Sequence, residues 1–265
     1  MLRTAITQPY RTISCGFDST TRQAGKLEPM KLEPMPRRET GPLAQIAGKA
    51  SPGVARIEAM REPHAAFWDE WNQNALLEDG PLWIALGDSS TQGIGAPDPN
   101  DSWVPIILQR LRSKTREPWR VINFSITGGQ FSDVLEHELP RVDQLITADH
   151  VPALSTIIIG ANNTMSIKSW PKANDELEQI MWALPDPSVV ARVGVSSPAS
   201  PLMARRFTNT IERISSEREF ENFWPWDWPS RDGMAEDKFH PNPQGYRYMA
   251  DLIWEPIAAT VGLLF

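Results

Sequence analysis

The sequence predicts an α/β fold: a doubly wound, mainly parallel sheet of five strands with helices on both faces. Short apolar runs without charge, at 82–87 and 155–159, are typical of strands that are buried on both faces of a sheet. Segments with apolar residues at helical spacing lie between such runs. Strands that alternate with helices along the chain favour a parallel sheet.

Residues 1–50 differ from the rest of the chain. They are rich in Arg, Thr, Gln, Gly and Pro and contain few aromatic residues, which predicts a disordered N-terminal extension. The pentapeptide Lys-Leu-Glu-Pro-Met occurs twice in tandem, at 26–30 and 31–35. Two such short copies cannot form a solenoid. A replication slip in an unselected tail is the favoured interpretation, and a short docking motif is the alternative.

Residues 51–77 are expected to form a helical lead-in that packs on the domain. Apolar residues recur there at helix-like spacing among charged ones, which predicts one or two helices, and a break is expected at Pro63. Gly80-Pro81 then precedes the first strand.

The main domain is expected over residues 78–265, with strands and helices in alternation. Pro140 is expected to bend the second helix of the domain. The expected strands are 82–87, 119–124, 155–159, 189–195 and 219–224, and the expected helices are 102–111, 132–145, 174–184, 202–217 and 243–261.

Composition excludes several classes of protein. A net charge of −7 over 265 residues argues against a nucleic-acid-binding surface. The one cysteine, Cys15, excludes an intrachain disulfide framework and fits a reducing compartment. No run approaches the ~18 apolar residues of a membrane span, and the N-terminus lacks the apolar core of a secretory signal. The expected location is the cytoplasm. The oligomeric state is left open, and a monomer is plausible.

Ser89 follows the first strand, in the glycine-rich stretch 87–95. Ligands bind beyond the carboxyl ends of the strands in open α/β sheets. A serine there can cap the next helix, contribute to a phosphate-binding loop, or act as a nucleophile. Helix capping is the default interpretation of a lone serine in such a turn.

Three further motifs change that interpretation, because together with the first they resemble the four blocks of the SGNH (GDSL-type) esterase/lipase family. The resemblance covers residues 78–262 and implies a flavodoxin-like strand order, 2-1-3-4-5. It also implies that no metal or organic cofactor is needed. The four blocks, in order, are Gly87-Asp88-Ser89-x-Thr91-x-Gly93, Asn123-Phe124-Ser125-Ile126-Thr127-Gly128, Gly160-Ala161-Asn162-Asn163 and Asp237-Lys238-Phe239-His240.

A serine nucleophile needs a base within hydrogen-bond reach. Of the four histidines, His64 precedes the sheet, His137 falls in a helix beside Glu136 and Glu138 on an expected solvated surface, and His150 lies at the wrong end of the third strand. His240 follows the last strand, which places it at the same edge as Ser89. Asp237, three residues earlier, can orient its imidazole.

Acyl transfer also needs donors for the developing oxyanion. The backbone N–H groups of Ser89 and Gly128 and the side-chain amide of Asn162 are the candidates, each just after an expected strand. Taken singly, Gly128 can be a plain turn residue and Asn162 a loop residue. Asn163 departs from the family pattern, which usually has aspartate there. We expect altered loop packing or activity from this change, not loss of function.

Trp224, Trp226 and Trp228 are the candidates for substrate binding. They precede the Asp237–His240 block and could line an acyl pocket or stack on a sugar. A proline-stiffened loop packed on the core is an equally good interpretation.

The sequence therefore predicts a serine hydrolase that cleaves small-molecule carboxylic esters through an acyl-enzyme, with short acyl chains or acetyl groups favoured. A catalytically impaired binding module of the same fold is one alternative, and a thioesterase or lysophospholipase is another. A phosphate-binding loop is disfavoured because Gly-x4-Gly-Lys-Ser/Thr does not occur.

Overall fold

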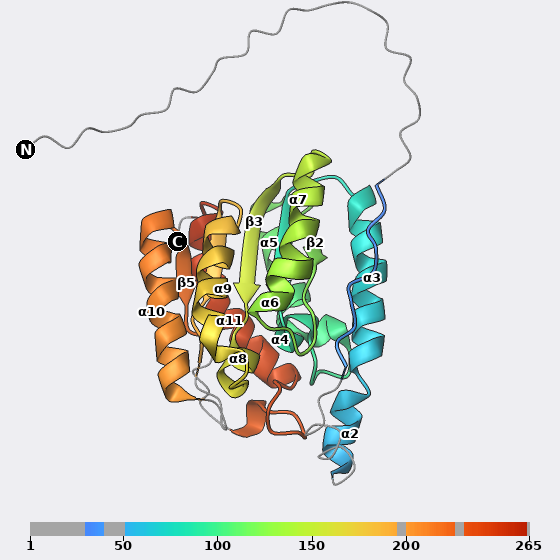
Figure 1. The fold of residues 1–265 in the computed structure, drawn as a ribbon. Coiled ribbons are helices and arrows are strands. Elements are labelled where there is room, and N and C mark those ends of the chain that lie inside the picture. Colours follow the sequence, from blue (N-terminus) through green and yellow to red (C-terminus); the bar gives the residue numbers. More distant parts are fainter. Residues whose placement is uncertain (1–29, 40–50, 195–199, 226–230, 264–265) are drawn as a thin grey trace, which may run out of the picture. The chain divides into compact units, whose positions relative to one another are not determined.

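Residues 30–39, 51–194, 200–225 and 231–263, which the computed structural model describes, contain one sheet of five parallel strands. The strands are β1 (Leu82–Gly87), β2 (Arg120–Asn123), β3 (Pro152–Ile158), β4 (Ser188–Ala191) and β5 (Glu221–Phe223). Their order in space is β2-β1-β3-β4-β5 (Figure 1). The predicted parallel sheet and the strand order implied by the resemblance are both confirmed.

The last two strands are shorter than the sequence predicts. β4 pairs with β5 only over residues 189–191, opposite 221–223. β5 is a three-residue edge strand, and one backbone bond beyond Ala191, from Arg192 N to Phe223 O at 2.8 Å, still joins the chain to it.

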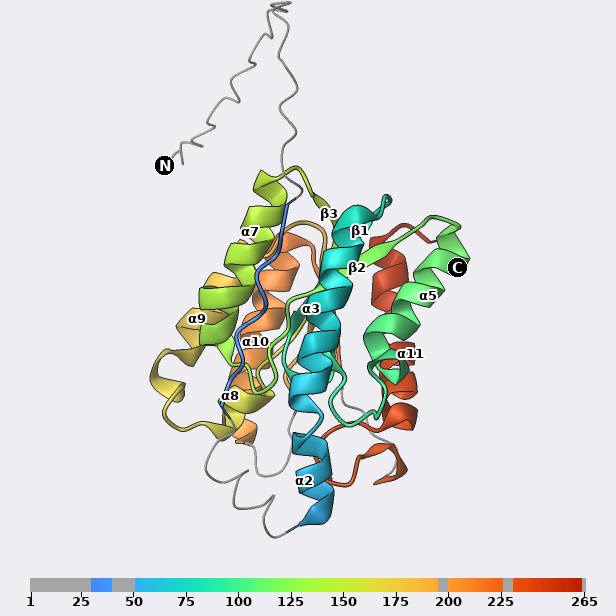
Figure 2. The same cartoon turned by 90° about the vertical axis from the view of Figure 1, so that its right-hand side faces the viewer.

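Helices cover both faces of the sheet (Figure 2). α5 and α11 pack against each other on one face, and α9 and α10 pack together on the other. The helices are α2 (Pro52–Glu58), α3 (Arg61–Leu77), α4 (Ser89–Gln92), α5 (Trp103–Thr115), α6 (Phe131–Asp133), α7 (Leu139–Thr147), α8 (Ala161–Met165), α9 (Trp170–Ala183), α10 (Pro201–Arg218) and α11 (Pro243–Thr260), with short 3₁₀ turns at Pro99–Asp101 and Arg231–Gly233.

α3 covers the free edge of β2. The side chain of Asn72 donates to the carbonyl of Asn123 and accepts from its amide, both at 2.8 Å, so that it stands in for a neighbouring strand. Trp71 Nε1 donates to the carbonyl of Val121 at 3.1 Å. An edge strand exposes unpaired backbone groups, and side chains of α3 satisfy three of those of β2.

Pro63 does not break the helical lead-in. The break between α2 and α3 lies at Ala59-Met60, and Pro63 sits in the first turn of α3. The first N–H groups of a helix have no intrahelical acceptor, so a proline costs no hydrogen bond there. Pro140 lies inside a continuous helical stretch, in which α6 passes through the π-helical turn η2 (Val134–Glu138) into α7, and the Leu139 N–H just before it donates to the Val134 carbonyl.

Residues 31–39 pack on the domain, which differs from the disorder that the composition predicts for this stretch. They lie between α3 and α7 (Figure 2). Leu32 and Met35 of the second pentapeptide copy are buried, with 4% and 5% of their surface exposed. Gln73 Nε2 donates to the Leu32 carbonyl at 2.5 Å, and Arg141 Nη2 donates to the Pro34 carbonyl at 3.1 Å. The composition of residues 1–50, taken as an average, gives no sign of these two buried side chains, Leu32 and Met35, and therefore predicts disorder for the whole stretch.

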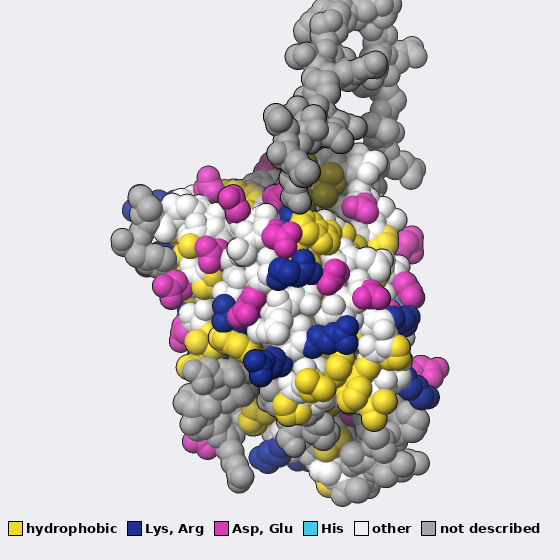
Figure 3. Space-filling view, turned by 60° about the vertical axis from the view of Figure 1, so that its left-hand side comes forward, with side chains coloured by type: hydrophobic (Ala, Val, Ile, Leu, Met, Phe, Trp, Pro, Cys, Tyr) yellow, Lys and Arg dark blue, Asp and Glu magenta, His cyan; other side chains and the backbone are white. Residues whose placement is uncertain are grey.

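The face shown in Figure 3 carries Lys and Arg side chains interspersed with Asp and Glu. Between α9 and α10, Arg213 pairs with Glu178 at 2.9 Å. No helix in the described ranges is long and apolar enough to cross a bilayer. Cys15, residues 26–29 of the first pentapeptide copy, Trp226 and Trp228 lie outside the described residues.

Candidate active site

The loops that follow β1, β2 and β3 are joined by backbone hydrogen bonds at one edge of the sheet. Ile126 N donates to Gly87 O at 3.0 Å, and Asp88 N donates to Ile158 O at 3.2 Å. These bonds continue the strand pairing on both sides of β1 beyond the ends of the ladders. They bring the predicted blocks around Ser89, Gly128 and Asn162 to the same place.

Asp88, not Ser89, caps the short helix α4. The Asp88 carboxylate accepts from Ser90 N at 3.1 Å and from Ser90 Oγ at 3.0 Å. Burial raises the pKa of Asp88, and the two hydrogen bonds oppose that shift. With the cap supplied by Asp88, Ser89 is the first residue of α4. Its N–H therefore has no acceptor within the helix, and its side chain is free of the capping role.

The Ser89 side chain meets His240. The distance from His240 Nε2 to Ser89 Oγ is 2.9 Å, across 151 positions of sequence. His240 Nδ1 lies 2.5 Å from Asp237 Oδ2. The structure thus brings together the three residues predicted as a catalytic triad, in one continuous hydrogen-bonded chain.

A tight turn holds Asp237 in place. Its Oδ1 accepts from the backbone amides of Phe239 and His240, both at 3.0 Å, while Lys238 adopts the left-handed conformation (φ 58°) that the turn requires. Burial raises the pKa of Asp237, but the hydrogen bonds from the His240 imidazole and from the two amides outweigh burial and hold the pKa below its ordinary value. The carboxylate is therefore ionised at neutral pH.

The segment after α4 sets the position of the His240 loop. Gly95 has φ 106°, and a Cβ added there would lie 2.2 Å from the Pro241 carbonyl oxygen and 2.9 Å from His240 Cβ. The buried Tyr246 hydroxyl donates to Ile94 O at 2.7 Å. Glycine at position 95 is what allows the two loops to approach so closely.

The two other predicted oxyanion donors lie on the neighbouring loops. Gly128 has φ 78°, in the left-handed region. Asn162 Nδ2 donates to Gly129 O at 2.9 Å, which ties the third block to the second. An amide nitrogen carries two hydrogens, so this bond leaves Asn162 one further hydrogen to donate.

Asn163, which departs from the family pattern, supports the loop as an acceptor. It is fully buried, and its Oδ1 accepts from Phe131 N at 3.0 Å. Its Nδ2 is buried and has no hydrogen-bond partner among the residues that the structure describes. The amide therefore keeps the acceptor that an aspartate would supply and adds a donor that is not satisfied.

Glu138 is a buried acid that sequence reasoning missed. The sequence predicts a solvated surface there, yet Glu138 is fully buried, and its Oε2 accepts at 2.8 Å from the N–H of Gly87, two residues before Ser89. Burial raises the pKa of Glu138 well above its ordinary value, and the charges of Asp133 and Asp88 raise it further. The only sequence signal is the spacing that puts Glu138 on the same helix face as Val134 and Val142.

The remaining candidates lie apart from this chain of hydrogen bonds. His64 is buried, and its Nε2 donates to Ala96 O at 3.0 Å. Burial lowers the pKa of His64, so the imidazole is a neutral packing residue. Trp224 is about half exposed (46%), with the Arg192 guanidinium 5.4 Å from its ring centroid. Its role in substrate binding stays a prediction. No cluster of His, Cys, Asp and Glu suited to a metal ion occurs within the described ranges.

The family comparison matches residues 85–248 to the GDSL-like lipase/acylhydrolase family. This span includes Ser89, Gly128, Asn162, Asp237 and His240. In the comparison with curated proteins, no sequence matches.

Solved structures of esterases share the fold. A lipase/acylhydrolase from Enterococcus faecalis superposes with a TM-score of 0.55 at 15% identity, over 68% of this chain and 96% of that one. The esterase EstA from a Pseudoalteromonas species, in a structure inhibited by monoethylphosphonate, superposes with a TM-score of 0.53 at 22% identity, over 68% of this chain and 98% of that one. A variant of an acetyl xylan esterase from Geobacillus stearothermophilus superposes with a TM-score of 0.50 at 15% identity, over 71% of this chain and 97% of that one.

Gly95→Ala tests whether close approach at position 95 sets the His240 geometry. The added methyl group must push the Pro241 carbonyl and His240 away, so we expect kcat for ester hydrolysis to fall by roughly 100-fold. Gly262→Ala is the matched control, because Gly262 also has positive φ, at 74°, but no described residue lies within 4 Å of a Cβ added there. Gly262→Ala should lose about 1–2 kcal/mol of stability from backbone strain alone and keep its kcat. Equal activity of the two variants would contradict this role of Gly95.

Glu138→Gln tests the buried acid. A carboxyl whose pKa is raised in the folded state binds more protons folded than unfolded, so its contribution to stability is lost as pH rises above the ordinary value of 4.5. The amide keeps an acceptor for Gly87 N–H and does not titrate. We therefore expect the free energy of unfolding of Glu138→Gln, measured in urea, to rise relative to that of the wild type between pH 5 and pH 7. The slope of this difference should be at most about 1.4 kcal/mol per pH unit.

Glu136→Gln, on the exposed side of the same π-helical turn, is the control for that experiment. The free energy of unfolding of Glu136→Gln should change with pH in parallel with that of the wild type. If Glu138→Gln does the same, the carboxyl of Glu138 titrates in the folded protein as it does in the unfolded chain.

Proposed function

The chain belongs to the GDSL-like lipase/acylhydrolase family and is a hydrolase acting on esters, and from that premise we propose that it cleaves carboxylic esters through an acyl-enzyme formed on Ser89. The observation that carries the proposal is the unbroken hydrogen-bonded chain from Asp237 through His240 to Ser89 Oγ, with links of 2.5 and 2.9 Å. Such a chain is what a weak hydroxyl nucleophile needs for activation.

In the first half of the proposed reaction, His240 Nε2 takes the proton from Ser89 Oγ as the oxygen attacks the ester carbonyl carbon. The imidazolium then gives that proton to the leaving alkoxide oxygen, and the alcohol departs from the acyl-enzyme. In the second half, water attacks the acyl carbon and gives its proton to His240. The carboxylic acid leaves as the proton returns to Ser89.

Asp237 is proposed to orient and stabilise His240. Its ionised carboxylate accepts from Nδ1–H and so fixes the tautomer in which Nε2 faces Ser89. When Nε2 gains a proton during attack, the carboxylate stabilises the positive charge. The amides of Phe239 and His240 hold Asp237 in this position throughout.

The proposed oxyanion hole takes one donor from each of the three joined loops. The N–H of Ser89 lies at the N-terminus of α4, Gly128 presents its backbone without a side chain in the way, and Asn162 has one amide hydrogen left over. Removing one such donor typically costs roughly 3–4 kcal/mol in the transition state. No step of this mechanism needs a metal or an organic cofactor.

A small-molecule ester with a short acyl chain or an acetyl group is the proposed substrate. The acetyl xylan esterase that shares the fold supports a small acyl group at such a site. Thioesters and lysophospholipids are the alternatives on the same fold. The intact hydrogen-bonded chain favours catalysis over a binding module that has kept only the fold.

Hydrolysis of p-nitrophenyl esters from acetate to palmitate tests the proposal. The wild type should turn over the short esters fastest, and Ser89→Ala should lose roughly 10⁴-fold or more in kcat. Ser90→Ala is the matched control, since Ser90 Oγ bonds to Asp88 and not to His240. Turnover by Ser89→Ala equal to that of Ser90→Ala would refute the serine mechanism. A palmitate optimum would refute the short acyl chain.

A further inference from the structure

Residues 31–39 lie outside the span that matches the family, yet they reach the loop that carries Gly128. Met35 N donates to Asp69 Oδ1 at 3.1 Å, which fastens this segment to α3 next to its buried Leu32 and Met35 side chains. The segment is therefore a defined part of the folded domain. Its last residues run toward the edge of the sheet where Ser89 lies.

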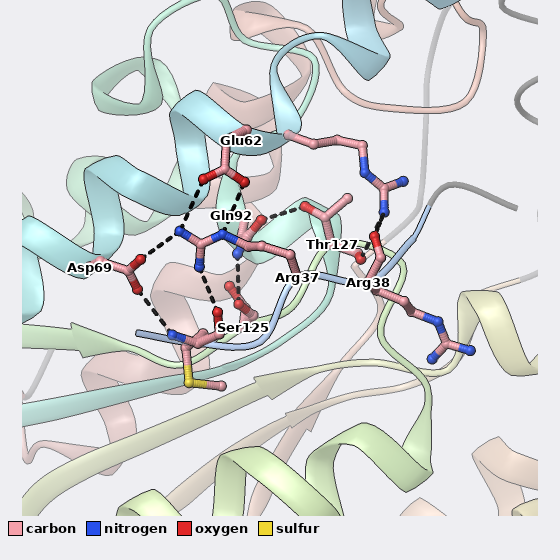
Figure 4. A network of polar contacts seen from close by, with 9 residues as sticks. Arg37, Arg38, Glu62, Asp69, Gln92, Ser125 and Thr127 are labelled. Atoms are coloured by element: carbon pink, nitrogen blue, oxygen red, sulfur yellow. Dashed lines mark hydrogen bonds and ion pairs between the residues drawn. The ribbon is translucent and has the colours of Figure 1, made fainter. Parts of the chain in front are cut away.

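Arg37 fixes the register of the segment (Figure 4). Its Nη2 donates to Asp69 Oδ2 at 2.6 Å and its Nε donates to Glu62 Oε2 at 3.1 Å. Both carboxylates come from the same side of α3. With Arg37 held between them, the next residue along the chain, Arg38, is directed to the loop after β2.

Arg38 and Arg61 hold the backbone on both sides of Gly128. After Gly128, Asp133 Oδ2 accepts from Gln130 N at 2.7 Å and is paired with Arg38 Nη1. Before Gly128, Arg61 Nη2 donates to Thr127 O at 3.5 Å. The same Arg61 nitrogen donates to Arg38 O at 2.8 Å, which links the two supports.

Gly128 itself lies under these two side chains. A Cβ added at Gly128 would be 3.6 Å from Arg38 Cδ and 3.7 Å from Arg61 Nη2. On the inner side, Gln92 Nε2 donates to Ser125 O at 2.8 Å, and the Gln92 side chain also contacts the Thr127 hydroxyl (Figure 4). The loop is thus held between the helix that begins at Ser89 and the N-terminal segment.

We propose that Arg38 and Arg61 are positioning residues that hold the Gly128 amide where the oxyanion forms, so that residues 31–39 complete the catalytic site. The inference rests on the proposed function of Gly128. An oxyanion donor acts only within a narrow range of distance, and its contribution is larger in the transition state than in the bound substrate. Loosening the loop should therefore lower kcat and leave KM almost unchanged.

The experiment uses the full chain with Arg38→Ala, Arg38→Lys and Asp133→Asn. Arg38→Ala should lower kcat for p-nitrophenyl acetate by roughly 10- to 100-fold with KM within about twofold. Arg38→Lys can still pair with Asp133 and should recover most of that loss. Asp133→Asn keeps an acceptor for Gln130 N–H but removes the ion pair, so its kcat should fall in the same direction.

Two matched controls separate positioning from general loss of stability. Arg110→Ala removes another Arg–Asp pair, with Asp251 at 2.5 Å, on the face of α5 that meets α11. Deleting one copy of Lys-Leu-Glu-Pro-Met shortens the chain but leaves the docked sequence unchanged. Both controls should keep wild-type kcat. A kcat loss in Arg110→Ala equal to that in Arg38→Ala would overturn the inference.

Amide hydrogen exchange decides the inference independently of catalysis. Peptides covering residues 125–131 should exchange faster in Arg38→Ala than in the wild type, and those covering β3 should not. Unchanged exchange together with unchanged kcat would overturn the positioning role and leave the proposed function intact. If the wild type hydrolyses no ester, the proposed function fails, and the exchange comparison still shows whether Arg38 holds the loop.

Discussion

The close approach of β1 to β3 at Gly87 is the constraint on which the site depends. Gly87 has φ 141°, and a Cβ there would lie 2.1 Å from the Ile158 carbonyl oxygen. Around this point, Gly87 O accepts from Ile126 N, Gly87 N donates to Glu138, and Asp88 N donates to Ile158 O. Parallel strands end together at one edge, and glycine lets them end close enough for three loops to share one site.

The partly buried Asp237 and the buried Glu138 both support the site, but they differ in protonation. Asp237 is kept ionised by donors that outweigh its burial. Burial dominates at Glu138, which therefore stays protonated well above its ordinary pKa and accepts a backbone N–H without adding a charge behind Ser89. One carboxylate can thus serve the imidazole while the other only supports the backbone. The difference lies in the number of donors that each receives.

Local motifs allowed part of this to be predicted from the sequence. Ser89 could be expected at the site because it follows a strand whose apolar run is plain to read, and Asp237 and His240 because their spacing resembles the last block of the family. Contacts set by distant residues left no such signal: Asn72 covering the β2 edge, Glu138 turned inward at a π-helical turn, and Arg38 docked beside Gly128. Composition predicted disorder for 31–39 because its two apolar anchors are outnumbered by polar neighbours.

Covalent labelling tests the central claim, that Ser89 is an activated nucleophile, most directly. The folded wild-type chain is incubated with a fluorophosphonate, digested and mapped by tandem mass spectrometry, with Ser90→Ala and His240→Ala in parallel. We expect one adduct, on Ser89, in the wild type and in Ser90→Ala, and strongly slowed labelling in His240→Ala. An unlabelled Ser89 in the wild type would contradict the claim that Ser89 is an activated nucleophile, and a binding module that has kept the fold would then explain the structure better.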